Sequence, residues 1–117
     1  MELKIHNPEV NPIAELQSEC VEIESTQDAL DLMGNSGYLG AGKIIIMQHH
    51  LCPDFFDLKS GVAGEILQKF SNYNVQLAVV GDFSVYKSKS LKDFIYESNK
   101  TGRIIFVATL DEAVRKL

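Results

Sequence analysis

The sequence predicts an α/β protein with a single small, mixed and mostly parallel β-sheet, helices packed on it and an N-terminal β-hairpin. Two observations support this fold class. The runs 43–47, 76–80 and 103–107 are mostly apolar and rich in β-branched residues, as strands buried on both faces are. Segments with apolar side chains at helical spacing lie between these runs. Since alternating strands and helices build parallel sheets, we expect the three runs to be adjacent parallel strands.

The hairpin is expected to consist of residues 2–6 and 13–17. Both segments alternate weakly between apolar and polar side chains, and two Asn-Pro pairs lie between them. The short run 21–23 is expected to extend the second strand. Right-handed crossovers then place the helices on the sheet and leave the hairpin as an antiparallel strand at one edge.

The first helix is expected to begin at Ser25, with Asp28 in a capping-box-like relation, and to end at Gly34 and Gly37. The second helix follows Asp57. Its apolar face is the clearest in the chain and consists of Val62, Ala63, Ile66, Leu67 and Phe70. On the opposite face of this helix, Glu65 and Lys69 are expected to pair.

The last two helices also have polar start signals. Ser90 with Asp93 predicts the start of the third helix, and Gly102 its end. Thr109 with Glu112 is a fuller capping box and predicts the start of a final helix. The predicted order is therefore β-β-α-β-α-β-α-β-α, in one domain without repeats or linkers.

Composition indicates a soluble single-domain protein. At 117 residues the chain is long enough for one hydrophobic core, and 45% hydrophobic with 23% charged residues is an ordinary balance. The net charge of −5 argues against nucleic acid as a partner, and no run reaches membrane-spanning length. The start lacks the apolar core of a signal peptide, and Cys20 and Cys52 form no paired motif. We therefore expect a cytoplasmic protein with reduced thiols.

The stretch from Gly37 to Lys43 has the glycine and lysine spacing of a nucleotide-binding Walker A loop. That loop works between a strand and a following helix, whereas here a helix is expected before it and a strand after it. Ile44 also stands where a magnesium-binding Ser or Thr is needed. We interpret the stretch as a helix-to-strand turn.

His49, His50 and Cys52 raise the question of a metal site or a nucleophilic cysteine. Adjacent histidines in an extended chain point in opposite directions, so we expect no metal, no cofactor and a loop packed on the core. A Cys52 nucleophile with a histidine base is the less favoured alternative, because such pairs usually come from distant segments.

The predicted ligand site lies at the carboxyl ends of the parallel strands, where open α/β sheets bind ligands. His49 follows the first of these strands, and Asp82 and Ser84 follow the second. Lys89 and Ser60, each near the start of a helix, complete the candidate ligand-binding residues. Helix N-termini and lysines there favour an anionic group, a phosphate or a carboxylate. Ser60 itself is either a helix cap or a phosphorylation site.

The stretches 25–33, 53–61, 64–70, 81–84 and 88–99 resemble a bacterial family, the domain of unknown function 4180. This resemblance covers nearly the whole chain from Ser25 and implies no activity. More loosely, the element order and the strand end at 78–82 are similar to the STAS fold of anti-sigma-factor antagonists. That likeness implies regulation through binding rather than catalysis. Those antagonists carry a phosphorylated serine in an Asp-Ser-(Ser/Thr)-Gly context, and Ser60-Gly61 approximates that motif. Here the aspartate, Asp57, lies three residues upstream of the serine instead of next to it, and the loop from Met47 to Ser60 is longer than in that family.

We therefore interpret the chain as a non-catalytic regulatory module that binds a small anionic ligand or a protein partner, with neither nucleic acid nor a membrane. The alternative is a small hydrolase-like enzyme that uses His49 or His50 with Asp82, which requires a recessed histidine–carboxylate pair. A third hypothesis is a carrier of an apolar small molecule, which requires an enclosed apolar cavity. A homodimer is expected because closed dimers are common.

Overall fold

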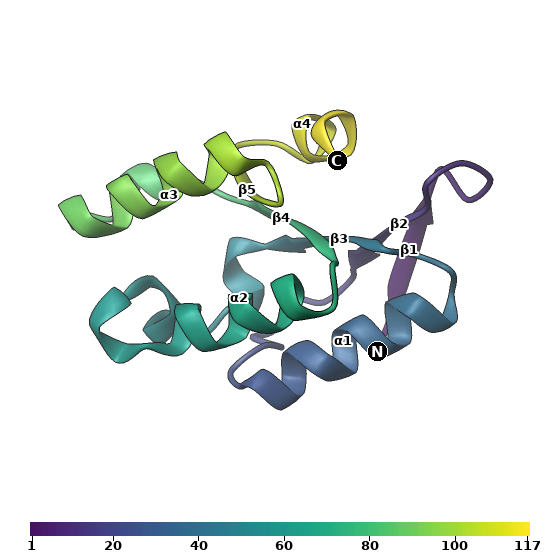
Figure 1. Cartoon of the computed structure of the whole chain (residues 1–117), viewed down its shortest axis with the longest axis horizontal. Coiled ribbons are helices and arrows are strands. Elements are labelled where there is room, and N and C mark those ends of the chain that lie inside the picture. Colours follow the sequence, from purple (N-terminus) through teal and green to yellow (C-terminus); the bar gives the residue numbers. More distant parts are fainter.

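The computed structural model describes residues 1–117 and contains one five-stranded sheet whose strand order follows the sequence (Figure 1). Its strands are β1 (Leu3–His6), β2 (Ile13–Leu16), β3 (Lys43–Met47), β4 (Gln76–Val80) and β5 (Ile104–Val107). β1 is antiparallel to β2, and β2 to β5 are parallel to one another. The predicted α/β class, the edge hairpin and the three adjacent parallel strands are confirmed.

Four α-helices cover the sheet, three on one face and one on the other. They are α1 (Thr26–Tyr38), α2 (Val62–Asn72), α3 (Lys89–Thr101) and α4 (Leu110–Lys116). Because each parallel strand is added on the same side of the previous one, right-handed crossovers bring α1, α2 and α3 to one face. There they cover Leu77 and Phe106, whereas α4 packs on Val80 and Val107 of the other face. Figure 1 shows α1 and α2 side by side.

The longest helices, α1 and α3, have 13 residues each, and none of the helices has the length and apolar character that a membrane span requires.

The predicted end of α1 at Gly34 and Gly37 is wrong, because the helix runs through both glycines. An internal glycine costs a helix only about 1 kcal/mol and does not by itself end it. The helix ends at Tyr38, and Gly40, just beyond the C-cap residue Leu39, has a φ of +84°, a left-handed backbone that glycine adopts without strain. The amides of Gly40 and Ala41 donate back to the carbonyls of Gly37 and Ser36, both at 2.9 Å. The stretch after Gly37 is thus a helix-to-strand turn, as predicted.

The predicted start of α3 at Ser90 is also wrong. Ser88 caps the helix, since its Oγ accepts a hydrogen bond from the Leu91 N–H at 3.1 Å, and Ser90 lies in the first turn. Both serines have the side chain that capping needs, so residue type alone does not distinguish them. Ser25 and Thr109 cap α1 and α4 as predicted.

Two smaller predictions fail as well. The run 21–23 does not extend β2, because Ile23 alone pairs, through an isolated parallel bridge with Leu51. Glu65 and Lys69 form no ion pair on α2. Exposed pairs at this spacing contribute only a few tenths of a kcal/mol, too little to hold two long side chains in one geometry.

Candidate functional site

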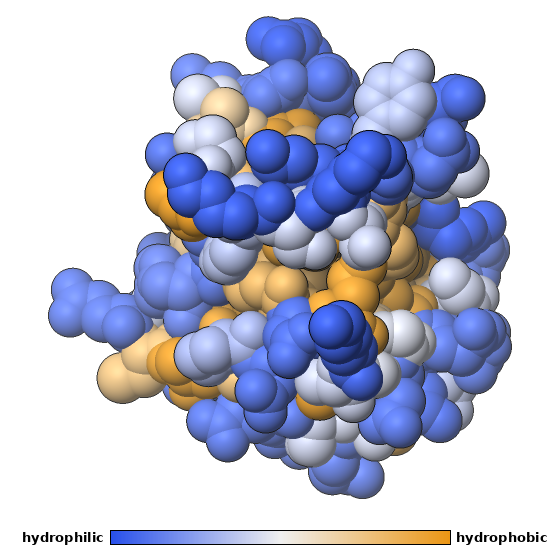
Figure 2. Space-filling view, turned by 90° about the vertical axis from the view of Figure 1, so that its left-hand side faces the viewer, coloured by the Kyte–Doolittle hydropathy of each residue, from blue (hydrophilic) through white to orange (hydrophobic).

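A cleft of about 650 Å³ opens at the carboxyl ends of β3 and β4. Ten residues line it, six of them hydrophobic: Val21, Met47, Gln48, His49, Leu51, Pro53, Phe56, Val80, Gly81 and Tyr86. Figure 2 looks onto this end of the molecule and shows apolar surface in the middle of it, with polar side chains above and below. The cleft lies at the end of the sheet where the sequence predicted a site.

The origin of this cleft differs from the predicted one. In doubly wound sheets a crevice forms where helices leave neighbouring strands toward opposite faces. Here the connecting helices α1 to α3 share one face, so the parallel strands have no such switch point. The long connection between β3 and α2 supplies a wall instead, through Gln48, Leu51, Pro53 and Phe56.

One wall of the cleft is aromatic. The rings of Phe56 and Tyr86 stack, with centroids 4.7 Å apart and planes inclined by 14°. Phe83 continues the cluster inward, with its centroid 6.2 Å from Phe56 and 5.3 Å from Phe106 of β5. Because each ring packs against the next and Phe106 belongs to the core, the aromatic wall is continuous with the hydrophobic core.

Gln48 holds the two sides of the cleft together. Its Nε2 donates to the Tyr86 hydroxyl at 2.7 Å, and its Oε1 accepts from the Asp82 N–H at 3.0 Å. The Gln48 side chain lies so close to Gly81 that a Cβ atom there would overlap it. Glycine at position 81 therefore allows β4 and the Gln48 side chain to approach each other.

His49 and His50 point the same way, and the predicted opposite orientation is wrong. They lie in a 3₁₀ turn, Gln48–His50, where side chains do not alternate as they do in a strand. The Nε2 atoms of both rings lie near the carbonyl oxygen of Ser18, at 3.0 and 2.8 Å. The Nδ1 of His50 accepts from the Met47 N–H at 2.9 Å, so His50 is the neutral tautomer that donates from Nε2.

The burial of His50, which is 1% exposed, is the main cause that lowers its pKa below 6.5. The hydrogen bond to the Ser18 carbonyl opposes this shift, and the nearby His49 adds to it. Both ring nitrogens of His50 are occupied, so binding a metal or taking a proton would break a hydrogen bond. No group of three or more His, Cys, Asp or Glu side chains is placed to hold a metal ion. Cys52 is half-buried and free.

Asp82 and Ser84, the next predicted site residues, bond to each other. The Asp82 carboxylate accepts from the Ser84 hydroxyl at 2.5 Å and from the Ser84 N–H at 3.0 Å. These two bonds lower the pKa of the exposed Asp82 carboxyl below its usual range. The pair closes the turn after β4 and brings no carboxylate to His49 or His50.

Ser60 and Lys89 lie outside the cleft lining. The exposed Ser60 hydroxyl donates to the carbonyls of Asp54 and Asp57, at 2.7 and 2.8 Å, and accepts from the Val62 N–H at 3.2 Å. It therefore bonds to the first amide of α2, whose N-cap residue is Gly61. Lys89 pairs with Asp93 on the surface of α3, with Nζ and Oδ2 3.1 Å apart.

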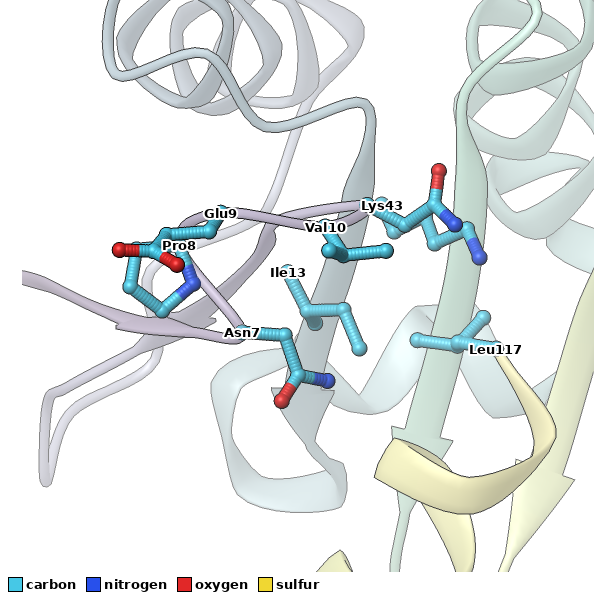
Figure 3. Close-up of a pocket in the computed structure, with 8 residues that line it drawn as sticks. Asn7, Pro8, Glu9, Val10, Ile13, Lys43 and Leu117 are labelled. Carbon is cyan, nitrogen blue, oxygen red and sulfur yellow. The ribbon is translucent and has the colours of Figure 1, made fainter.

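A second pocket, of about 460 Å³, lies at the opposite end of the sheet, between the hairpin turn and the end of α4 (Figure 3). Ile13 and Leu117 point toward each other across it, and Val10 and Lys43 lie along its margin. None of the predicted site residues lines this pocket.

Sequence reasoning missed most of the apolar lining of the cleft, namely Val21, Leu51, Pro53, Phe56 and Tyr86. Phe55 and Phe56 belong to the loop that the sequence predicts to pack on the core. No signal in the sequence separates the two rings, because both are apolar and both are buried. Phe55 is 0% exposed, whereas Phe56, although buried, also faces the cleft.

The fold and the cleft define a small α/β protein with an apolar, partly aromatic site at the carboxyl end of its sheet. Within that class, the chain belongs to the family described as Domain of unknown function (DUF4180), whose model matches residues 9–117. The resemblance noted in the sequence is confirmed. No curated protein and no solved structure matches the chain. The likeness to the STAS fold therefore rests on the element order and the strand end at 78–82.

Proposed function

We propose that this protein is a non-catalytic binding module whose cleft takes an apolar or aromatic group of a ligand or partner. The observation that supports the proposal is the lining, in which six of ten residues are hydrophobic and Phe56 stacks on Tyr86. Burying apolar surface there yields about 25 cal/mol per Å², and the few polar groups of the rim orient what binds. Binding without chemistry accords with a regulatory role.

Catalysis has less support from the geometry. A general base needs a proton acceptor within reach of its substrate and, for histidine, a partner that orients it. The ring nitrogens of His50 are both bonded, His49 bonds to the Ser18 carbonyl, and the Asp82 carboxylate bonds to Ser84. The carrier hypothesis also has less support, because side chains such as Phe70, at 0% exposure, fill the space between helices and sheet.

The predicted anionic ligand fits this cleft less well than an uncharged one. No lysine or arginine lines the cleft. The chain neighbours of its lining include Glu22, Asp54 and Asp82, whose carboxylates oppose the approach of a phosphate or carboxylate. We therefore favour a neutral apolar group.

Amide chemical-shift mapping with two probes tests the proposal, indole as a neutral aromatic group and inorganic phosphate as an anion. Indole is expected to shift the amides of Gln48, His49 and Gly81, and phosphate to leave them in place. The variant Val21→Glu puts a charge into the lining and should abolish the indole shifts. Val85→Glu is the matched control, since both valines are exposed, by 42% and 59%, but only Val21 lines the cleft.

Three results would refute this proposal: indole shifts confined to other surfaces, phosphate shifts at the cleft without indole shifts, or equal losses in both glutamate variants. Phosphate shifts at Ser60 and Lys89 alone would favour the anion site predicted from the sequence.

A further inference from the structure

The outer edge of β5 is closed by side chains. Asn99 of α3 takes the place of a neighbouring strand, because its Oδ1 accepts from the Phe106 N–H at 2.7 Å and its Nδ2 donates to the Phe106 carbonyl at 3.2 Å. The Ser98 hydroxyl donates to the Ile104 carbonyl on the same edge. A strand from another molecule would have to displace these bonds.

The opposite edge, on β1, is open. The Gln17 N–H donates to the Glu2 carbonyl at 2.9 Å, so these two residues form a hydrogen-bonded pair between the hairpin strands. Bonded and non-bonded pairs alternate along an antiparallel ladder. With Leu3 opposite Leu16 and Ile5 opposite Ala14, the backbone N–H and C=O groups of Leu3 and Ile5 therefore point away from β2. No side chain of the molecule bonds to them.

We propose that β1 pairs with β1 of a second copy of this chain, antiparallel across a two-fold axis, so that two sheets become one. The new hydrogen bonds would use the outward-facing backbone groups of Leu3 and Ile5, so the two-fold axis can lie at Leu3, at Lys4 or at Ile5. An axis at Lys4 sets Lys4 against Lys4 of the second copy, and an axis at Ile5 sets Lys4 against His6. An axis at Leu3 sets Glu2 against Lys4 twice. Since like charges directly opposite each other destabilise a sheet and opposite charges stabilise it, the geometry points to the Leu3-centred register.

A short strand that carries a lysine is also an ordinary way to blunt a sheet edge. The exposed glutamate at position 2 distinguishes the two cases, because only the Leu3-centred register places a carboxylate opposite each Lys4. The strand has only 4 residues, so the contact is smaller than the roughly 1,200–2,000 Å² of stable complexes, and we expect weak association.

Sedimentation equilibrium of the full chain at concentrations up to about 0.5 mM tests this pairing, a range suited to a small, weak interface. The wild type is expected to form dimers. Glu2→Lys and Lys4→Glu should each weaken dimerisation on the order of tenfold or more, since each sets like charges against each other twice. An equimolar mixture of the two variants should associate again as a heterodimer, because every lysine then faces a glutamate.

Two controls accompany the charge variants. Glu97→Lys makes the same charge change on the exposed surface of α3 and should leave dimerisation unchanged. Thermal unfolding of Lys4→Glu checks the hairpin, because Lys4 lies opposite Glu15 within the chain. A wild type that stays monomeric, a dimer that both charge variants leave intact, or folded variants that do not associate when mixed would each overturn the proposal.

Discussion

Replacing Phe70 of α2 by alanine tests whether the apolar face read from the sequence holds this helix on the sheet. Phe70 is 0% exposed and belongs to the main core between the helices and the sheet. A buried phenylalanine truncated to alanine costs about 3–5 kcal/mol, through lost transfer free energy and the cavity left behind. A chain of 117 residues has a total stability of roughly 6–18 kcal/mol at about 0.05–0.15 kcal/mol per residue. The variant should therefore fold with a large part of its stability gone.

Urea unfolding followed by far-ultraviolet circular dichroism measures this loss, as a fall of roughly 2 M in the midpoint. Tyr73→Ala is the control, because Tyr73 follows the same helix and is 63% exposed, so its loss should stay within about 0.5 kcal/mol. A loss below about 1 kcal/mol for Phe70→Ala, or equal losses in the two variants, would mean that the packed face of α2 is misassigned.

Three further perturbations follow from the site and the edge. The folded state holds the pKa of His50 below 6.5, so the unfolded chain binds a proton there more readily than the folded chain does. The stability of the wild type should therefore fall as the pH drops below 6.5. The urea midpoint of His50→Gln should change less than that of the wild type between neutral and acidic pH. Gly81→Ala should cost about 1–3 kcal/mol because the new methyl overlaps Gln48, and Gln48→Ala added to it should cost less than the separate losses combined. Asn99→Ala should cost about 1–3 kcal/mol and speed hydrogen exchange at the Phe106 amide, and an unchanged exchange rate would contradict the edge closure.

The strands were predictable because burial on both faces leaves a strong local pattern. β3, β4 and β5 are four or five residues long, and each strand begins and ends within one residue of its predicted bounds. Helix ends depend on single hydrogen bonds and backbone angles instead. Gly34 and Gly40 are the same residue type, and only the left-handed backbone at Gly40 separates an end from an interior position.

The location of the cleft was predictable from sheet direction, and its chemistry was not. Parallel strands deliver their carboxyl ends to one side, so Gln48, His49 and Gly81 could be placed together from the order of elements alone. Val21 and Tyr86 are distant in sequence and meet only through tertiary packing. The orientation of the two histidines followed from a 3₁₀ turn, which has no periodic pattern in so short a segment.

The sequential strand order has a consequence for how the chain is made. Each strand from β2 onward pairs with the strand that precedes it in the chain, so its first partner has always been synthesised before it. Each parallel pairing nevertheless joins distant residues, such as Ala14 with Ile44 and Leu77 with Ile104, so a loop must close before the pairing stabilises the sheet, which slows folding. During synthesis from the N-terminus, each new strand emerges after the neighbour it pairs with, and each connecting helix covers the same face as the one before. The apolar surface over Val80 and Val107 is then the last to leave water, when α4 emerges.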